Sequence, residues 1–487
     1  MGAYAEGVGA EMFDKEIRNF SIDSRSIEAG ELFFALSQAD YTRAGFNGEF
    51  EDGHRFIPDA FARGAVAAVA RLDNVQESED LRQMGDRLLL VEDAIAALQE
   101  LARRVYEAWA QPVVGITGSA GKTTTKDLTA HILKATGRRV LKSERNYNNG
   151  LGLPLAVLQM VAEENKPSDY DLAVLEMGMS SPTGEIARLV KITPPDIGVE
   201  LLVAPVHLEY LGTIENIAKA KAELIEGLKP GGTAVLNADD ELVIKMRELH
   251  EGPVITFGLE NPADVTALAV DTTRFGQSRF RLRTPLGEAD AVLPMAGHHN
   301  LMNALAASSV ATCLGISPAE IAGALQSVVP PRMRGEVLDF AAGFTVVDDS
   351  YNSNPRSLVS MARTLAETKS RARRRIVVAG EMLELGAESL EMHRDAGREI
   401  ARLGIDVLWG VRGHALEMTE GALEEGMARE AVRYFESSEE AARALPGEIR
   451  EGDLVLVKGS RGVRTDIVVS ELRESFALLG ADERAGQ

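Results

Sequence analysis

Apolar and polar residues follow each other along this chain in blocks that predict strands and helices in alternation. Apolar runs at about 113–117, 172–176, 197–203 and 233–236 have the length of buried strands, and helical patterns separate them. Strands that alternate with helices indicate a mainly parallel sheet with helices on both faces. The middle of the chain is therefore predicted to be a doubly wound α/β domain.

Blocks of the same kind lie on either side of this region. The first hundred residues show short strands and an amphipathic helix that ends before Gln111-Pro112, and the paired prolines Pro330-Pro331 precede a second series of strands and helices. Together with a length of 487 residues, these breaks predict three domains. They are a small N-terminal α/β domain (1–108), the central domain (109–328) and a C-terminal Rossmann-like domain (329–487).

A turn of small residues joins the run at 113–117 to a helix that starts at Lys122 and stops near Gly137. A strand, a glycine-rich turn and Lys-Thr at a helix start form a cradle for nucleotide phosphates. Lys122 would reach the β- and γ-phosphates, and the Thr123 hydroxyl would bind magnesium. The spacing departs from the usual phosphate loop, and a plain strand-to-helix turn would explain the glycines but not the lysine. The cradle is predicted to comprise Gly118, Ser119, Ala120, Gly121, Lys122, Thr123 and Thr124.

Ligands of parallel sheets bind at the carboxyl ends of the strands, so polar residues there are candidates for the site. Glu176 ends one strand and could hold magnesium with Thr123. His207 follows another strand, as a metal ligand or as a structural histidine. Asn148 and Asn149 lie on a loop before an apolar helix, where they contact substrate or cap the helix.

Other polar groups leave two interpretations open. Asn300 starts a helix, and its amide reads a base edge or caps the helix. Lys219, Lys221 and Glu223 form a solvated helix face on composition alone. The remaining groups are the cluster Asp23, Ser24 and Arg25, the linker residues Arg332 and Arg334, and the strand-end residues Tyr351, Asn352, Lys458 and Arg461. The structural alternative for Asp23, Ser24 and Arg25 is a salt-bridged turn, and the alternative for Arg332 and Arg334 is a pair of solvated linker charges.

The charge balance excludes some partners. Lys+Arg 52 against Asp+Glu 74 gives a net charge of −22, which argues against non-specific binding to nucleic acid or to anionic membranes. The one cysteine, Cys313, lies in an apolar segment and is predicted to be a small buried residue. No signal peptide or membrane-spanning run is visible, so a cytoplasmic protein is expected. We also expect a monomer.

Nine motifs occur in the order found in the Mur ligases, and the chain resembles that family over nearly its whole length. The motifs are TGSAGKTTTK, NYNNGLGLPL, LEMGMSSPTGEI, HLEYLG, AKAKAEL, GHHNLMNALAA, DDSYNSNPRSL, GEMLELG and VLVKGSRG. DDSYNSNP and GEMLELG are most similar to the family member that adds D-alanyl-D-alanine. The stretch before His207 departs from the family, which usually has a Thr-Asn-containing strand end and an alanine next to the histidine. Here the stretch reads ELLVAPVHLE, with Leu201, Leu202, Pro205 and Val206.

The resemblance implies an ATP- and Mg²⁺-dependent ligase. UDP-N-acetylmuramoyl-tripeptide would be phosphorylated on its carboxylate, and the amine of D-alanyl-D-alanine would attack the acyl phosphate, in the last cytoplasmic step toward the peptidoglycan pentapeptide precursor. Catalysis would depend on positioning and charge neutralisation. Alternatives are another amide ligase of the superfamily with a different acceptor amine, or a nucleotide-binding regulator without ligase activity.

The resemblance also implies residue roles. Lys122, His207, Lys221 and Arg334 would be catalytic, with Lys221 carbamylated and Arg334 approaching the γ-phosphate. The magnesium ligands would be Thr123, Glu176, His207 and Lys221. Asn300, Tyr351 and Asn352 would line the adenosine. Substrate would contact Asp23, Ser24, Arg25, Asn148, Asn149, Lys458 and Arg461.

Overall fold

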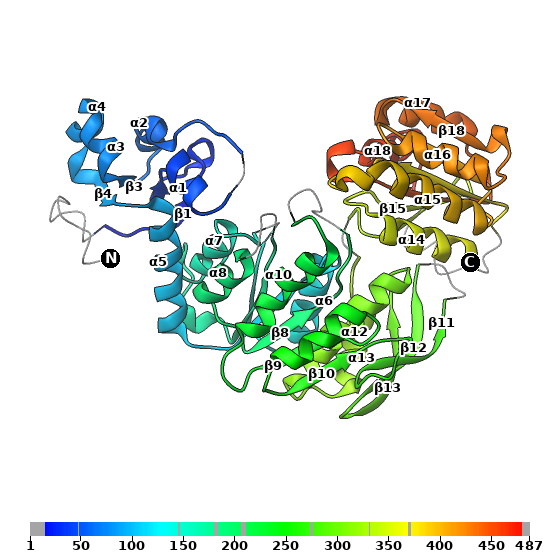
Figure 1. Cartoon of the computed structure of the whole chain (residues 1–487), viewed down its shortest axis with the longest axis horizontal. Coiled ribbons are helices and arrows are strands. Elements are labelled where there is room, and N and C mark those ends of the chain that lie inside the picture. Colours follow the sequence, from blue (N-terminus) through cyan, green and yellow to red (C-terminus); the bar gives the residue numbers. More distant parts are fainter. Residues whose placement is uncertain are drawn as a thin grey trace. The chain divides into compact units, whose positions relative to one another are not determined.

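The computed structural model describes residues 15–46, 48–144, 147–179, 184–205, 211–272, 276–330, 332–368 and 372–479. The chain divides into two compact units. The first comprises Met1–Val203 and Ala218–Thr256, and the second comprises Ala204–Ile217 and Phe257–Gln487. Figure 1 shows the elements in chain order, coloured from blue to red. The predicted boundaries near residues 108 and 328 stay predictions.

A four-stranded parallel sheet begins the first unit. Its order is β1-β2-β3-β4, with strands Asn19–Ser21 (β1), Glu31–Phe34 (β2), Ala67–Arg71 (β3) and Leu88–Val91 (β4). The helices are α1 (Gln38–Arg43), α2 (Ile57–Ala62), α3 (Leu72–Glu77), α4 (Glu79–Gln83) and the longer α5 (Ala94–Trp109). Phe33, Ala68 and Leu88 belong to the apolar core of this part.

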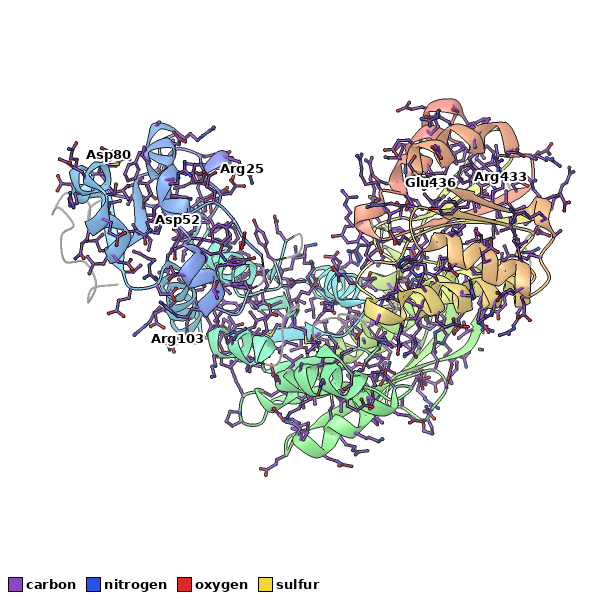
Figure 2. All side chains as sticks on the ribbon, turned by 45° about the horizontal axis from the view of Figure 1, so that its top comes forward. Arg25, Asp52, Asp80, Arg103, Arg433 and Glu436 are labelled. Atoms are coloured by element: carbon purple, nitrogen blue, oxygen red, sulfur yellow. The ribbon has the colours of Figure 1, made fainter. Side chains whose placement is uncertain are left out.

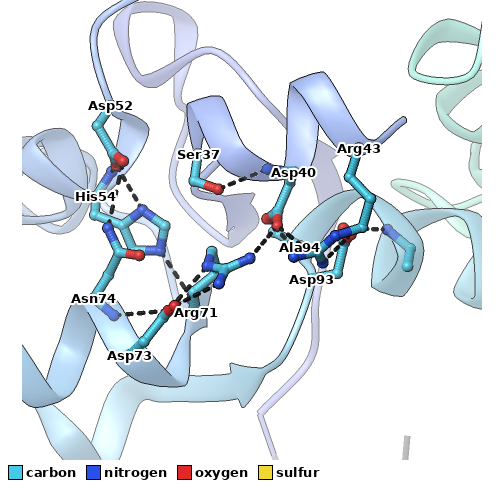
Figure 3. A network of polar contacts seen from close by, with 11 residues as sticks. Ser37, Asp40, Arg43, Asp52, His54, Arg71, Asp73, Asn74, Asp93 and Ala94 are labelled. Atoms are coloured by element: carbon cyan, nitrogen blue, oxygen red, sulfur yellow. Dashed lines mark hydrogen bonds and ion pairs between the residues drawn. The ribbon is translucent and has the colours of Figure 1, made fainter. Parts of the chain in front are cut away.

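A buried carboxylate holds three elements of this part together (Figure 3). Asp40 on α1 is fully buried; it accepts a hydrogen bond from the main-chain N of Ala94 at 2.9 Å and pairs with Arg71 at the end of β3. His54 accepts the main-chain N–H of Arg71 at Nε2, over 2.8 Å, and its Nδ1 lies 2.7 Å from Asp52. The segment from Asp52 to His54 therefore contributes to the packing of this sheet.

The second sheet of the first unit is the predicted doubly wound sheet. Its order is β10-β9-β8-β5-β7-β6, and the ladders from β6 to β9 are parallel. The strands are Val113–Thr117 (β5), Val140–Lys142 (β6), Leu172–Glu176 (β7), Ile197–Glu200 (β8), Thr233–Asn237 (β9) and Val254–Phe257 (β10). The helices are α6 (Lys122–Ala135), α7 (Gly152–Leu158), α8 (Glu185–Ile192), α10 (Ile214–Glu226) and α11 (Glu241–Ile244).

An antiparallel sheet begins the second unit. Its strands β11 (Thr266–Asp271), β12 (Ser278–Thr284) and β13 (Gly287–Leu293) pair in chain order, and helices α12 (His298–Cys313) and α13 (Pro318–Gln326) follow. Cys313 is half-buried rather than fully buried, and desolvation raises the pKa of its thiol to about 12. A thiol with a raised pKa stays protonated at neutral pH and is a poor nucleophile.

The last sheet carries apolar cores on both faces, as a Rossmann-like domain requires. Its order is β14-β15-β19-β16-β17-β18, and all pairs are parallel except β14 with β15. The strands are Glu336–Asp339 (β14), Thr345–Asp349 (β15), Arg374–Gly380 (β16), Val407–Val411 (β17), Val432–Phe435 (β18) and Asp453–Lys458 (β19). The helices are α14 (Pro355–Glu367), α15 (Ser389–Arg402), α16 (Ala415–Glu424), α17 (Ser438–Glu448) and α18 (Asp466–Ser475).

The predicted strands of the central sheet are confirmed, with one difference. β8 ends at Glu200 and not near residue 203, because Leu202 and Val203 form hydrogen bonds outside the strand ladder. The main-chain O of Leu202 accepts the N–H of Ser119 at 2.8 Å, and the N–H of Val203 donates to Asp240 at 3.0 Å. None of the helices in the described part of the chain combines the length and apolarity needed to span a bilayer.

Candidate active site

The predicted phosphate loop lies between β5 and α6. Gly118 and Gly121 have φ values of +148° and +86°, a region that favours glycine. A Cβ on Gly118 would stand 2.8 Å from the Cβ of Leu201, so a side chain would push the loop away from β8. The N–H of Ser119 donates to Leu202. The glycines therefore hold the loop against the end of β8.

Lys122 and Thr123 are the first two residues of α6. The Lys122 ammonium donates to the main-chain O of Gly118 at 2.8 Å, folded over the loop. The Thr123 hydroxyl donates to Glu176 Oε2, also at 2.8 Å. A hydroxyl and a buried carboxylate in contact are the oxygen ligands that magnesium prefers, so these residues fit that ion.

The asparagine loop has two separate functions in the structure. Asn148 donates through Nδ2 to Glu176 Oε1 at 2.8 Å, and its main-chain O accepts the N–H of Gly178 at 2.7 Å. Asn149 accepts the N–H groups of Leu151 and Gly152 at the start of α7. Asn149 is thus a helix cap, whereas Asn148 orients the carboxylate of the magnesium candidate.

Lys221 is buried, so the solvated-face interpretation is wrong for this residue. It is 2% exposed, whereas Lys219 on the same helix is exposed. Burial lowers the pKa of Lys221 to about 7; repulsion from Lys122 adds to this effect and Glu200 opposes it. A lowered pKa favours the uncharged amine form of Lys221. Glu223 also departs from the prediction, because its carboxylate accepts N–H groups at the start of α8.

Glu200 is a group that the sequence analysis missed. It is fully buried, and its two carboxylate oxygens have no hydrogen-bond partner within the described ranges. Burial raises its pKa to about 8, against the attraction of Lys221 and Lys122. The apolar run was predicted to continue to about residue 203, which placed Glu200 inside the strand. The sequence feature that could have indicated Glu200 is a carboxylate at the end of a strand, beside the phosphate loop.

The predicted metal ligand His207 lies outside the described residues. The predicted contribution of His207 to a second magnesium site therefore stays a prediction.

The N-terminal cluster forms a salt-bridged turn. Arg25 donates from Nε and Nη2 to the two oxygens of Asp23 at 2.9 and 2.8 Å. The Asp23 carboxylate also accepts the main-chain N–H of Arg25 and caps a short 3₁₀ helix that begins at Ser24. The Arg25 side chain is 86% exposed and points away from the body of this unit (Figure 2). A solvent-facing guanidinium remains available to an anionic ligand.

The second unit gathers several other predicted residues. The Tyr351 ring lies under the guanidinium of Arg334 at 4.1 Å and within 6.0 Å of that of Arg461. Two guanidinium groups on one aromatic ring form a surface suited to anions and flat rings. Asn300 is buried and donates through Nδ2 to Ala296 O at 2.7 Å, as a structural asparagine does.

Lys458 is more constrained than the sequence suggested. Its ammonium is buried and lies 2.6 Å from Asp349 Oδ2 and 2.9 Å from the main-chain O of Asn352. Lys458 thus joins the end of β19 to the segment after β15. Arg461, with a side chain 63% exposed, is the freer of the two predicted substrate ligands on this motif.

Family models match most of the chain. Residues 116–311 match the Mur ligase middle domain, and residues 333–461 match the glutamate ligase domain of the Mur ligases. Two curated relatives are named UDP-N-acetylmuramoyl-tripeptide–D-alanyl-D-alanine ligase. The one from Bacillus subtilis is 33% identical and that from Escherichia coli 34% identical; the alignments cover 94% and 93% of this chain and the same shares of the relatives.

Solved structures agree with the sequence comparison. MurF from Acinetobacter baumannii superposes with a TM-score of 0.80 at 29% identity, covering 94% of both chains. MurF from Thermotoga maritima in complex with ADP has a TM-score of 0.79 at 28% identity and covers 95% of this chain and 98% of its own. The chain belongs to the Mur ligase family.

Proposed function

We propose that this chain joins D-alanyl-D-alanine to UDP-N-acetylmuramoyl-tripeptide, with ATP as the energy source. The chain is an ATP-dependent ligase that forms a carbon–nitrogen bond. The observation that carries the proposal is the contact of Thr123 with Glu176 beside Lys122, in a chain similar to such ligases over nine-tenths of its length. The product is the UDP-linked pentapeptide precursor of peptidoglycan.

The reaction has two chemical steps. The tripeptide carboxylate attacks the γ-phosphorus of ATP, and the bond from this phosphorus to the bridging β-phosphate oxygen breaks. ADP departs, and the tripeptide now carries an acyl phosphate. The dipeptide amine then attacks the acyl carbon, loses a proton and expels inorganic phosphate. Lys122 is proposed to turn from Gly118 to the γ-phosphate and to neutralise it.

The magnesium site is proposed on Thr123 and Glu176, with Lys221 and His207 at a second ion. Magnesium, when bound, supplies positive charge against the phosphoryl oxygens. The lowered pKa of Lys221 favours the uncharged amine, which can attack carbon dioxide. The nitrogen bonds to carbon and one N–H proton leaves to solvent, so that a carbamate replaces a cation.

The remaining roles are proposals as well. Gly118 to Thr124 would cradle the phosphates, Asn300, Tyr351 and Asn352 would line the adenosine, and Arg334 would contact the γ-phosphate. Asp23, Ser24, Arg25, Asn148, Asn149, Lys458 and Arg461 are the proposed substrate contacts. We propose a cytoplasmic monomer. We also propose that it binds neither nucleic acid nor membranes, because its net charge of −22 opposes association with anionic surfaces.

Phosphate release from ATP tests the function. We expect release from purified protein only when UDP-N-acetylmuramoyl-tripeptide and D-alanyl-D-alanine are both present, with L-alanyl-L-alanine as the matched control acceptor. Mass spectrometry should find the UDP-pentapeptide. Release driven by a single amino acid would instead identify a sibling ligase, and release without the UDP-peptide would contradict a ligase of this type.

A further inference from the structure

Lys126 is a buried lysine that none of the roles above uses. It lies one helical turn after Lys122 on α6 and is only 2% exposed. Its ammonium donates to the main-chain O of Ser143 at 2.7 Å. Burying an ammonium group is costly unless its contacts compensate for lost water. A residue of this kind in an α/β core therefore calls for a role.

Ser143 contacts Lys126 through its main-chain O and Glu176 through its hydroxyl. Ser143 is fully buried just after β6, and its main-chain N donates to Val174 O at 3.2 Å. Its hydroxyl oxygen accepts the main-chain N–H of Glu176 at 3.1 Å. Lys126 and Glu176 are thus connected through the two sides of one buried serine.

Ser143 holds the main chain of Glu176, and two further contacts hold its carboxylate. Glu176 accepts hydrogen bonds from Thr123 on α6 and from Asn148, each at 2.8 Å. The contacts therefore form a closed ring, which runs from Thr123 along α6 to Lys126, through Ser143 to Glu176 and back to Thr123. A closed ring fixes the distance between the helix and the carboxylate more firmly than either link alone.

We propose that Lys126 is a positioning residue for Glu176, which it holds through Ser143 at the distance from Thr123 that a bound magnesium ion needs. The inference rests on the magnesium role proposed for Glu176. Lys126 itself contacts neither substrate nor metal in this scheme. Its removal should weaken the contribution of magnesium to nucleotide binding, and should spare the contacts that the phosphate loop makes without the ion.

The chain contains a matched control. Lys142, at the end of β6, pairs with Asp127 at 2.8 Å, and Lys126 lies 3.7 Å from the same carboxylate oxygen. The Lys142 side chain is 38% exposed and donates to Asp127 rather than to the Ser143 carbonyl that Lys126 holds. Lys142→Met therefore removes a neighbouring positive charge while the ring through Ser143 stays intact.

Calorimetric binding of ADP, with magnesium and with EDTA, tests the inference in the full-length chain. We expect Lys126→Met to weaken binding about tenfold with magnesium, since loss of groups that orient metal ligands typically costs that much. With EDTA, the affinity of Lys126→Met for ADP should stay within about twofold of wild type, because no metal ligand is then in use. The affinity of Lys142→Met should stay within about twofold of wild type in both buffers, since this lysine orients no metal ligand. Circular dichroism checks that each variant is folded.

Ser143→Ala, which removes only the hydroxyl, keeps the test decisive if Lys126→Met does not fold, and it should show the same dependence on magnesium. An equal loss in both buffers, no loss, or an equal effect of Lys142→Met would overturn the inference. Binding of ADP needs no acceptor, so the outcome is independent of ligation. If wild type fails to ligate D-alanyl-D-alanine but the magnesium-dependent loss appears, only the proposed function fails.

Discussion

Lys219 and Lys221 lie two residues apart on α10, yet only Lys221 is buried. Residue type alone gives a lysine on a helix a solvent-facing position, because its charge is costly to bury. Glu200, at the carboxyl end of β8, lies within electrostatic range of Lys221. Proximity between separate elements is not visible in local periodicity, so only the family resemblance indicated Lys221.

Replacement of Lys221 tests its proposed role. We expect Lys221→Ala to lose ligase activity, because the proposed carbamate would be missing from the magnesium site. A small added carboxylate such as acetate should restore part of the activity, since it can occupy the space that the lysine vacates. Lys219→Ala is the control and should keep wild-type rates. Full activity of Lys221→Ala without additions would contradict the proposed role.

Asp348 should make stability depend on pH. Burial raises the pKa of this carboxyl from 3.8 to about 6, although hydrogen bonds from Ser350 oppose the shift. The folded protein thus binds a proton more tightly than the unfolded chain, and this stabilisation is complete below about pH 4 and is lost as pH rises through 6. Asn cannot titrate. Between pH 4 and pH 7, Asp348→Asn should gain up to about 3 kcal/mol relative to wild type.

Thermal unfolding at several pH values measures this difference. The exposed Glu430, replaced by Gln, serves as the control and should follow wild type across the range. A constant offset between Asp348→Asn and wild type from pH 4 to pH 7 would argue against a raised pKa.

At the scale of elements, prediction worked where a strand is buried on both faces. β5 and β7 coincide with the apolar runs that predicted them, because continuous apolar residues between turn signals leave little choice. The antiparallel sheet of β11 to β13 was not predicted, although Phe280 and Leu282 alternate with arginines along β12. Its one exposed face gives a pattern of period two, which differs from the continuous apolar runs that indicated the buried strands.

A carboxylate from one helix caps another in this structure. Glu223 on α10 accepts the N–H groups of Gly184 and Ala187 at 2.6 and 2.9 Å, at the start of α8. A carboxylate there satisfies free N–H donors and interacts favourably with the helix dipole. We expect Glu223→Ala to cost about 1 kcal/mol, the typical loss for an N-terminal cap.

Hydrogen exchange can localise this effect. Amides at the start of α8 should exchange several-fold faster in Glu223→Ala, while those of the C-terminal sheet stay unchanged. Glu226→Ala, an exposed change on the same helix, is the control. Equal exchange in both variants would mean that the cap contributes nothing to α8.

At the scale of the molecule, the fold class followed from the alternation of apolar runs with helical patterns and the reaction class from the order of motifs, and the comparisons confirm both. The roles of single residues followed less well. Asn149 caps a helix and Lys458 is held in an ion pair, because asparagines and lysines serve structure and chemistry with the same atoms. Only three-dimensional contacts separate the two uses.

Nucleotide binding should stabilise the chain through Lys122. A ligand at a hundred times its Kd raises unfolding free energy by about 2.7 kcal/mol. Mg-ADP should therefore raise the melting temperature of wild type and slow hydrogen exchange in 113–123. Lys122→Ala removes the cation proposed to face the phosphates and should lose both effects, together with turnover, while its melting temperature without ligand stays near wild type.

Lys134→Ala is the matched control, because this lysine is exposed in the last turn of the same helix. It should keep the full response to Mg-ADP. Since the chain has two compact units, unfolding need not be a single transition, and local exchange in 113–123 is the more direct readout. If Mg-ADP still protected the amides of 113–123 in Lys122→Ala as it does in wild type, Lys122 would not be the residue that binds the phosphates. The assignment of the glycine-rich turn as a phosphate cradle would then be wrong.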